Sequence, residues 1–404
     1  MSLIVQKYGG TSVGDLVRIQ KVARRVADTY DKGHDLVVVL SAMSGVTDHL
    51  LQMAEVITDT PDRRELDVLV ATGEQQTVAL LAIALKNLGY KAQSLLGFQA
   101  EIKTDSSWSN ARIVTINPDR MKALLAQKTI VIVAGFQGVD PKGNVTTLGR
   151  GGSDTSAVAV AAAVGADVCE IYTDVKGVYT ADPNVVPKAR MLKTVTHDVM
   201  LEMADHGAKV LQIRSVEFAK KFNVPVHVRS SFCEEEGTMI VSENQDMERT
   251  VVAGVTSSKK EARVTITKVP DQPGVASKLF AAVAEIGVSV DMIIQNTRSG
   301  NLTDITFTVP RADYKRTLEV VKKVASAIGA ESVAGDENIA TVSITGVGMR
   351  TNRGVAAKMF ETLAENGVNI MMISTSEIRI TCAIEEKFAD QATRALHTAF
   401  GLDE

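Results

Sequence analysis

The sequence predicts an α/β protein: a mostly parallel open sheet sandwiched by helices, followed by two small α+β domains. Three observations carry this prediction. In residues 1–230, aliphatic runs alternate with helical patterns, the order from which such sheets are built. The composition turns polar and acidic over residues 231–244. Beyond this boundary the chain repeats itself with a period of about 80 residues, which suits two small domains.

Five near-continuous aliphatic runs are expected to form strands that are covered on both faces. They are LIVQKYGG (3–10), DLVVVLSA (35–42), TIVIVAGF (129–136), VCEIYTDV (168–175) and VPVHVRS (224–230). The helical patterns are Leu16–Lys32, Gln75–Leu88, Asp119–Gln127, Thr155–Val164 and Asp198–Asn223.

The repeats begin at Val264 and Val342, and Gly274 and Gly287 of the first copy match Gly354 and Gly367 of the second. Each copy predicts a strand, a glycine-bearing turn, an amphipathic helix and two further strands, the start of an α+β sandwich. We expect the first domain at residues 1–245 and the repeats at 262–335 and 340–404.

Composition excludes several classes of protein. A net charge of −4 without a basic block argues against nucleic acid and anionic membranes as partners. The longest apolar runs, such as Leu36–Leu40, are too short to span a bilayer, and the N-terminus lacks a signal-peptide pattern. Cys169, Cys233 and Cys382 form no CxxC pair or zinc spacing, which fits a reducing cytoplasm.

Glycines follow four of the predicted strands, and ligands of open α/β sheets bind at that edge. In KYGGTSVGD, Lys7 precedes Gly9 and Gly10, whose backbone amides can approach phosphate oxygens before a helix start. A plain strand–turn–helix with a solvated lysine is the alternative. The P-loop pattern GxxxxGK[ST] is absent, and GRGGSD does not complete GxGxxG.

The segment GRGGSDTS repeats this chemistry before an alanine-rich helix. Ser153 or Asp154 can cap that helix, but capping does not explain Arg150, Gly151 and Gly152 as well. Arginine beside a diglycine suits bidentate capture of a carboxylate or phosphate.

Other candidates carry weaker signals. Glu74 in TGEQQT stands just before a helix, and either capping or a functional role explains it. Thr173, Asp174, Tyr179 and Asp182 surround a turn at a strand end, and Lys209 follows Gly207 near a helix start.

These motifs, with SAMSGVTD and AGFQGVD, occur in the order found in aspartate kinases, so the chain resembles that group of the amino acid kinase family. The tail resembles the paired ACT domains that regulate these enzymes. The resemblance implies an amino acid kinase fold and ATP-dependent phosphorylation of the aspartate side-chain carboxylate, the first step of lysine, threonine and methionine biosynthesis. Mg²⁺ would be carried mainly by the nucleotide.

The resemblance also implies residue roles. Lys7 and Lys209 would neutralise the phosphates, and Asp154 would organise both lysines. The implied ATP contacts are Lys7, Tyr8, Gly9, Gly10, Ser41, Thr173, Asp174, Tyr179, Asp182 and Lys209. The implied aspartate contacts are Thr47, Glu74 for the ammonium, Arg150 for a carboxylate, Gly151, Gly152, Ser153 and Asp154. Asn184 departs from the arginine of many relatives.

Lysine and threonine are the implied inhibitors, bound between ACT domains of different chains. Their implied contacts are Gly274, Ala276, Asp291, Gln295, Thr306, Asn369, Ile370, Ser376 and Glu377. Gly274 alternatively only turns the chain, and Ser376 is alternatively a surface residue. The assembly is expected to be a homo-oligomer or an α2β2 complex with a second start near Met247, unless that methionine stands there by chance.

Aspartate suits the absence of a histidine motif. Its side chain, with a pKa of about 3.9, is ionised at neutral pH and attacks without a general base. Three alternatives stay open: another amino acid kinase such as glutamate 5-kinase, an amino-acid sensor with an inactive kinase core, and a tail that only builds an oligomer interface.

Overall fold

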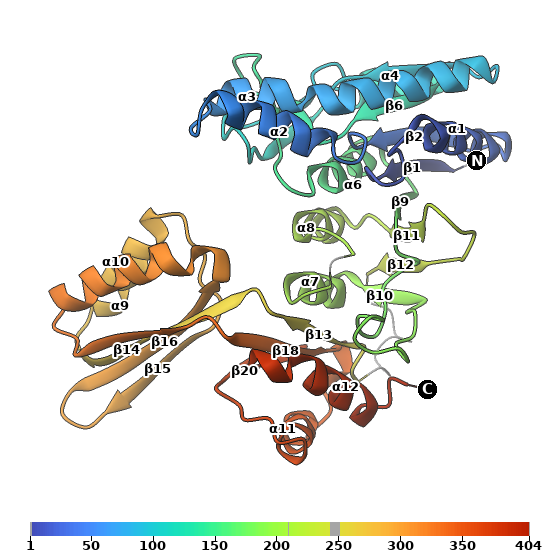
Figure 1. Ribbon diagram of the computed structural model, residues 1–404. Coiled ribbons are helices and arrows are strands. Elements are labelled where there is room, and N and C mark those ends of the chain that lie inside the picture. The colour runs from blue at the N-terminus through green and yellow to red at the C-terminus, as the bar shows by residue number, and fades with distance from the viewer. Residues whose placement is uncertain (1, 209, 243–250, 404) are drawn as a thin grey trace. The chain divides into compact units, whose positions relative to one another are not determined.

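The computed structural model describes residues 2–208, 210–242 and 251–403 (Figure 1). The chain forms two compact units. The first comprises Met1–Val178, Met191–Ala204 and Lys209–Gln245, and the second comprises Tyr179–Arg190, Asp205–Ala208 and Asp246–Glu404.

The first unit is built on an eight-stranded sheet with the order β10-β12-β11-β9-β1-β2-β6-β3. Every neighbouring pair is parallel except β11 and β12. Its strands are β1 (Leu3–Tyr8), β2 (Asp35–Leu40), β3 (Ala92–Leu95), β6 (Ile130–Ala134), β9 (Val168–Thr173), β10 (Thr194–Thr196), β11 (Val226–Ser230) and β12 (Thr238–Val241). All five predicted strands are present, and the predicted fold class is confirmed.

Helices cover both faces of this sheet because its central strands are apolar on both sides. One face of β1, β2 and β6 packs with α1 (Leu16–Asp31) and α4 (Thr72–Asn87) in a single core (Figure 1). Alternate residues of the same strands, such as Val5, Val37 and Val131, are equally buried and point to the other face. There α6 (Gly152–Val164) contacts β1, β2 and β9.

The remaining elements of this unit extend the edges. The helices are α2 (Val46–Ile57), α3 (Arg63–Val70), α5 (Asp119–Ala126), α7 (His197–Asp205) and α8 (Ile213–Phe222). A small sheet has the order β5-β4-β7-β8, with β4 (Ile102–Thr104), β5 (Ile113–Ile116), β7 (Gln137–Val139) and β8 (Val145–Thr147). The sequence analysis missed α2, α3 and this sheet.

The predicted helix Asp198–Asn223 is wrong, because the structure divides it into α7 and α8. Gly207 lies in the break with a φ of +121°, a left-handed conformation that a side chain disfavours. A Cβ atom at Gly207 would also lie 2.3 Å from the carbonyl oxygen of Ser257. Two amphipathic segments in succession read as one helix because the break holds a single glycine.

The second unit holds the two repeats, each with a four-stranded antiparallel sheet. The first repeat consists of β14 (Glu261–Pro270), α9 (Val275–Glu285), β15 (Ile293–Arg298), β16 (Leu302–Pro310), α10 (Tyr314–Ala327) and β17 (Ser332–Asp336). The second consists of β18 (Ile339–Thr345), α11 (Val355–Glu365), β19 (Met372–Thr375), β20 (Arg379–Glu385) and α12 (Ala389–Ala399). The strand and helix order predicted for each repeat is present.

The second sheet takes its fourth strand from the chain that precedes the first repeat. The sheet orders are β15-β16-β14-β17 and β13-β18-β20-β19, so β13 (Gly254–Ser258) occupies the place that β17 has in the first repeat. It pairs antiparallel with β18, Gly254 opposite Thr345. The first repeat is therefore inserted into the second. The strand β13 lies outside the ranges 262–335 and 340–404 that were expected for the repeats from the sequence.

One helical stretch of the described residues, Arg63–Asn87, is long and apolar enough to cross a membrane by length and composition alone. It consists of α3 and α4 in succession, although the individual apolar runs are short. Val78, Leu81 and Leu85 lie in the buried core that α4 shares with the sheet. The α4 part of the stretch is therefore packed against the sheet of the first unit.

The close contact at Gly207 predicts a site-specific loss of stability. Gly207→Ala should lower the thermal unfolding midpoint more than Gly33→Ala, because Gly33 has a φ of +90° but open space around its Cβ position. Gly33→Ala introduces only the backbone strain of a positive φ, of order 1 kcal/mol. The difference between the two midpoints therefore reports the clash with Ser257. Equal shifts of the two midpoints, measured by differential scanning fluorimetry, would contradict the contact.

Candidate functional site

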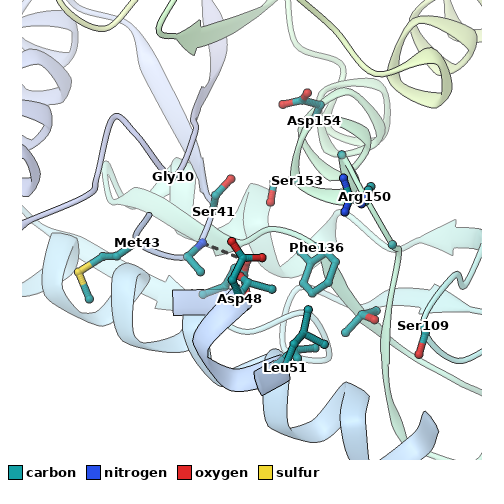
Figure 2. Close-up of a pocket in the computed structure, with 18 of the residues that line it drawn as sticks. Gly10, Ser41, Met43, Asp48, Leu51, Ser109, Phe136, Arg150, Ser153 and Asp154 are labelled. Carbon is teal, nitrogen blue, oxygen red and sulfur yellow. Dashed lines mark hydrogen bonds between the residues drawn. The ribbon is translucent and has the colours of Figure 1, made fainter. Parts of the chain in front are cut away.

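A pocket of about 700 Å³ lies at the carboxyl edge of the first unit's sheet (Figure 2). It gathers residues from the ends of β1 and β2 and from the starts of α2, α4 and α6. Figure 2 shows Arg150 and Asp154 on one side of it and Asp48 and Leu51 on the other. Ten predicted site residues line it: Lys7, Gly10, Ser41, Thr47, Glu74, Arg150, Gly151, Gly152, Ser153 and Asp154.

An ion pair joins the end of β1 to the first turn of α6. Lys7 Nζ and Asp154 Oδ1 are 2.6 Å apart, and their side chains are only 10% and 13% exposed. Parallel pairing of β1 with β2 and β9 carries the ends of these strands to the same edge. The N-terminus of α6, where backbone amides and the helix dipole favour anions, begins beside the pair.

Close backbone packing explains the glycines after β1. A Cβ atom at Gly10 would lie 2.9 Å from the carbonyl oxygen of Ala42, and one at Gly9 would lie 3.2 Å from Lys7 Nζ. Side chains here would push against the end of β2 or displace the lysine. The turn therefore presents backbone and one cation, the surface that a phosphate needs.

Glu74 does not cap its own helix, so the capping interpretation is wrong. It lies in the first turn of α4, and its Oε1 accepts a hydrogen bond of 3.0 Å from the amide of Ala42. Its other oxygen, Oε2, is buried without a hydrogen-bond partner among the described residues. Burial raises the pKa of this carboxyl to about 7. A buried acceptor without a partner at a pocket wall is suited to a cationic ligand group.

Arg150 supplies the opposite charge in the same pocket. It is exposed at the pocket rim just before α6, and no carboxylate in the described part of the chain pairs with it. A free guanidinium, a carboxyl with a raised pKa and the Lys7–Asp154 pair thus share one cavity. Such a set can hold a molecule that carries both an ammonium and carboxylates.

The structure does not gather all of the predicted nucleotide contacts in this pocket. Tyr8 is buried and stacks on Tyr172 with ring centroids 4.7 Å apart, so its side chain points into the core. Thr173 and Asp174 lie at the end of β9 and do not line the pocket. Tyr179 and Asp182 belong to the second unit, and Lys209 lies outside the described residues. Asn184 donates hydrogen bonds to Asp182 Oδ1 from its backbone and side-chain nitrogens, at 2.9 and 3.0 Å.

One buried carboxylate that organises the pocket had no detectable sequence signal. Asp67, in α3, accepts hydrogen bonds from the amide and hydroxyl of Thr147 at 2.7 and 2.8 Å and from the amide of Ser109 at 3.0 Å. It thereby fixes the end of β8, three residues before Arg150. In the sequence, Asp67 lies in a stretch for which neither a motif nor a helix was predicted.

The predicted effector residues lie in both repeats, at different positions in each. In the first repeat, Gly274 and Ala276 lie at the start of α9, Asp291 precedes β15, and Gln295 and Thr306 lie on β15 and β16. The hydroxyl of Thr306 donates to that of Thr265 at 3.2 Å. In the second, Asn369 and Ile370 lie between α11 and β19, and Ser376 and Glu377 form the turn between β19 and β20. Gly274 begins α9 with a φ of +92°, as a turning role requires, and Ser376 is exposed.

Family models match three parts of the chain. The amino acid kinase family model matches residues 2–230, and two ACT domain models match residues 263–328 and 342–400. The aspartate kinase of Pseudomonas putida is 55% identical over 404 residues, covering 100% of this chain and 98% of that protein. The aspartokinase of Pseudomonas aeruginosa is also 55% identical over 405 residues, with the same coverage.

Solved structures agree with these matches. A crystal structure of aspartate kinase from Synechocystis is 45% identical with a TM-score of 0.56, covering 99% of this chain and 70% of that one. The structure of E. coli aspartokinase III in complex with aspartate and ADP, in the R-state, has a TM-score of 0.82 at 24% identity, covering 98% of this chain and 99% of that one. At that identity the likeness establishes the fold.

The chain belongs to the amino acid kinase family, whose model covers more than half of its length. Within this family it is one of the aspartate kinases, phosphotransferases in which a kinase domain is followed by two ACT domains. The resemblance recognised in the sequence is confirmed.

The raised pKa of Glu74 predicts a pH-dependent stability. The unfolded carboxyl titrates near 4.5 and the folded one near 7, so the fold is favoured at low pH and loses this advantage as pH rises through 7. Glu74→Gln, which stays neutral, should therefore gain stability relative to wild type between pH 5 and 8, by up to about 3 kcal/mol. Thermal unfolding midpoints of wild type and Glu74→Gln at pH 5 and pH 8 measure this gain. Glu55→Gln, a substitution at an exposed position, is the control. A midpoint difference that does not change with pH would contradict the buried carboxyl.

Proposed function

We propose that the chain transfers the γ-phosphoryl group of ATP to the side-chain carboxylate of L-aspartate, giving 4-phospho-L-aspartate. The observation that carries this proposal is the Lys7–Asp154 pair, which lies in the same pocket as Glu74 and Arg150. The E. coli aspartokinase III structure, which holds aspartate and ADP in the same fold, supports it.

Aspartate is bound through its charges. The Glu74 carboxylate receives the ammonium group, and the approach of this cation favours the ionised form of a carboxyl whose pKa is raised to about 7. Arg150 holds a carboxylate of the substrate in a bidentate contact, and Thr47, Gly151, Gly152 and Ser153 line the space around it. These contacts leave the side-chain carboxylate directed at the phosphates.

Phosphoryl transfer then needs positioning and charge neutralisation. A carboxylate oxygen of aspartate forms a bond to the γ-phosphorus. The bond from that phosphorus to the bridging oxygen breaks, and its electron pair leaves with ADP. Lys7, the amides of Gly9 and Gly10 and the start of α6 stabilise the phosphate charge, while Asp154 holds Lys7 in place. No proton moves in this step.

The other nucleotide contacts rest on the resemblance. Lys209 would assist at the phosphates and Ser41 would lie beside them. Thr173, Asp174, Tyr179 and Asp182 would hold the nucleoside, with the backbone rather than the buried ring of Tyr8 contributing.

We propose that Mg²⁺ arrives on the nucleotide. No three His, Cys, Asp or Glu side chains in the described ranges gather closely enough to hold a metal ion. Bound to ATP, the ion would reduce the negative charge of the phosphates. Lys7 and the glycine turn fit such a complex because they offer donors and no competing carboxylate beyond Asp154.

The ACT repeats are proposed to bind lysine and threonine as feedback inhibitors, at the sites named above between repeats of different chains. The bound lysine named for the T-state structure of E. coli aspartokinase III supports an effector of this class. A homo-oligomer or α2β2 assembly in the cytoplasm is the proposed setting; Met247, the candidate second start, lies outside the described residues. Cys169, Cys233 and Cys382 are free thiols, as a reducing compartment allows.

A phosphotransfer assay tests the proposed reaction. ATP consumption should depend on aspartate and be much slower with glutamate or acetylglutamate. Lys7→Met should lower kcat by roughly 100-fold, because it removes one charge-stabilising donor, whereas exposed Lys122→Met should change it less than about twofold. A preference for glutamate, or an unchanged kcat in Lys7→Met, would overturn the assignment.

The regulatory proposal makes a separate prediction. Millimolar lysine plus threonine should lower activity and raise the thermal unfolding midpoint of the full chain. Asp291→Ala should weaken both effects, because it removes a proposed contact, while Asp271→Ala, an exposed acid of the same repeat, should not. If both amino acids leave activity and midpoint unchanged, the repeats serve only as an oligomer interface.

A further inference from the structure

A second pocket, of about 580 Å³, lies between α1 and the ends of β9 and β11 in the first unit. It shares no lining residue with the catalytic pocket. Six cations line it, together with the carboxylates of Asp28 and Glu234. Glu234 pairs with Arg25 at 2.7 Å, and two carboxylates outside the lining, Asp15 and Glu170, pair with Arg18 at 3.4 Å and with Arg229 at 3.3 Å, so the six cations face four carboxylates. The cations are Arg18, Lys21, Arg24, Arg25, Lys32 and Arg229.

Two of the arginines form a fixed floor. The guanidinium groups of Arg25 and Arg229 lie over the ring of Tyr172, at 5.0 and 5.7 Å from its centroid. Arg25 also donates to the carbonyl oxygen of Ser231 at 3.2 Å, and Arg229 pairs with Glu170 at 3.3 Å. Their side chains are only 21% and 25% exposed, so both forks are held in place before any ligand binds.

The other wall is a row of cations on α1. Lys21 is three residues after Arg18 and four before Arg25, so all three occupy one side of the helix. Lys21, Arg24 and Lys32 are exposed, and no carboxylate of the described residues pairs with them. Like charges at this spacing destabilise a helix. A bound anion would remove that repulsion.

The pocket also borders the glycine turn, residues 9–12 after β1. Arg18 donates to the carbonyl oxygen of Thr11 at 2.6 Å, and the hydroxyls of Ser12 and Ser231 are 2.5 Å apart. Arg18 also lies over the ring of Phe232, at 5.3 Å from its centroid. Side-chain contacts thus hold the walls of this pocket in place. The pocket lies next to the catalytic pocket and is separate from it.

We propose that this pocket binds a small molecule with two or more linked phosphoryl groups. The guanidinium groups of Arg25 and Arg229, held in place over Tyr172, and the three cations without a carboxylate partner among the described residues suit tetrahedral, multiply charged groups. The inference goes beyond the proposed function and does not depend on it, because the two pockets have no lining residue in common.

Calorimetric titration of the full-length chain with inorganic pyrophosphate, without Mg²⁺, tests the proposal. The Lys7→Met background removes one of the two proposed phosphate-binding cations of the catalytic site, and a site with submillimolar affinity that depends on Lys21 and Arg24 should persist there. Lys21→Glu or Arg24→Glu in that background should weaken binding at least about tenfold. Lys122→Glu, the same charge reversal on α5 outside both pockets, should weaken it less than about twofold.

Four outcomes would overturn the proposal. The first two are no pyrophosphate binding in the Lys7→Met background and equal weakening of binding by Lys21→Glu and Lys122→Glu. The third is an equal affinity for citrate, which would show that carboxylates are sufficient. The fourth is unchanged binding in Lys21→Gln and Arg24→Gln. The neutral variants keep the test valid if a charge reversal impairs folding, which thermal midpoints of all variants check.

Discussion

The ion pair between Lys7 and Asp154 is the interaction on which the site depends. Its atoms are 2.6 Å apart, and both side chains are nearly buried. A buried pair adds little net stability because desolvation offsets most of its attraction. The pair matters because it holds Lys7, beside the glycine turn, against the start of α6. The sheet supplies this geometry because β1, β2 and β9 run in parallel and end at one edge.

The same pocket contains groups that the fold leaves unsatisfied. Glu74 has a buried oxygen without a partner and a pKa raised to about 7, and Arg150 has no carboxylate beside it in the described part of the chain. The buried Glu74 carboxyl lowers the stability of the ligand-free protein at neutral pH, and the proposed zwitterionic substrate pairs with both groups. The site therefore resembles others in which local stability is given up for binding. An acceptor that is already an anion explains why the pocket needs cations and amides rather than a base.

Much of the fold was predictable from local pattern. Near-continuous aliphatic runs gave the central strands, and glycines after those runs marked the functional edge, because both signals are contained in a few adjacent residues. Features that depend on distant contacts were not predictable. Gly207, in the break between α7 and α8, packs closely against Ser257, and β13 pairs with β18, which lies beyond an entire repeat in the sequence.

The site shows the same division. The charged and glycine-rich motifs, together with the family resemblance, predicted ten lining residues, but Asp67 acts through hydrogen bonds to Thr147 and Ser109 that no spacing reveals. Tyr8 lies in the predicted motif, yet its ring stacks on Tyr172 in the core. The sequence predicted a helix over Leu16–Lys32 but no role for its cations. Only the fold brings Arg229 and the loop after β11 opposite them.

The most direct measurement is a crystal structure of the full chain with ADP, aluminium fluoride and aspartate, which together mimic the transition state of phosphoryl transfer. The account predicts the fluoride within hydrogen-bonding distance of Lys7 Nζ and the glycine-turn amides, with the aspartate ammonium on Glu74. A fluoride bound elsewhere, with Lys7 still directed only at Asp154, would contradict it.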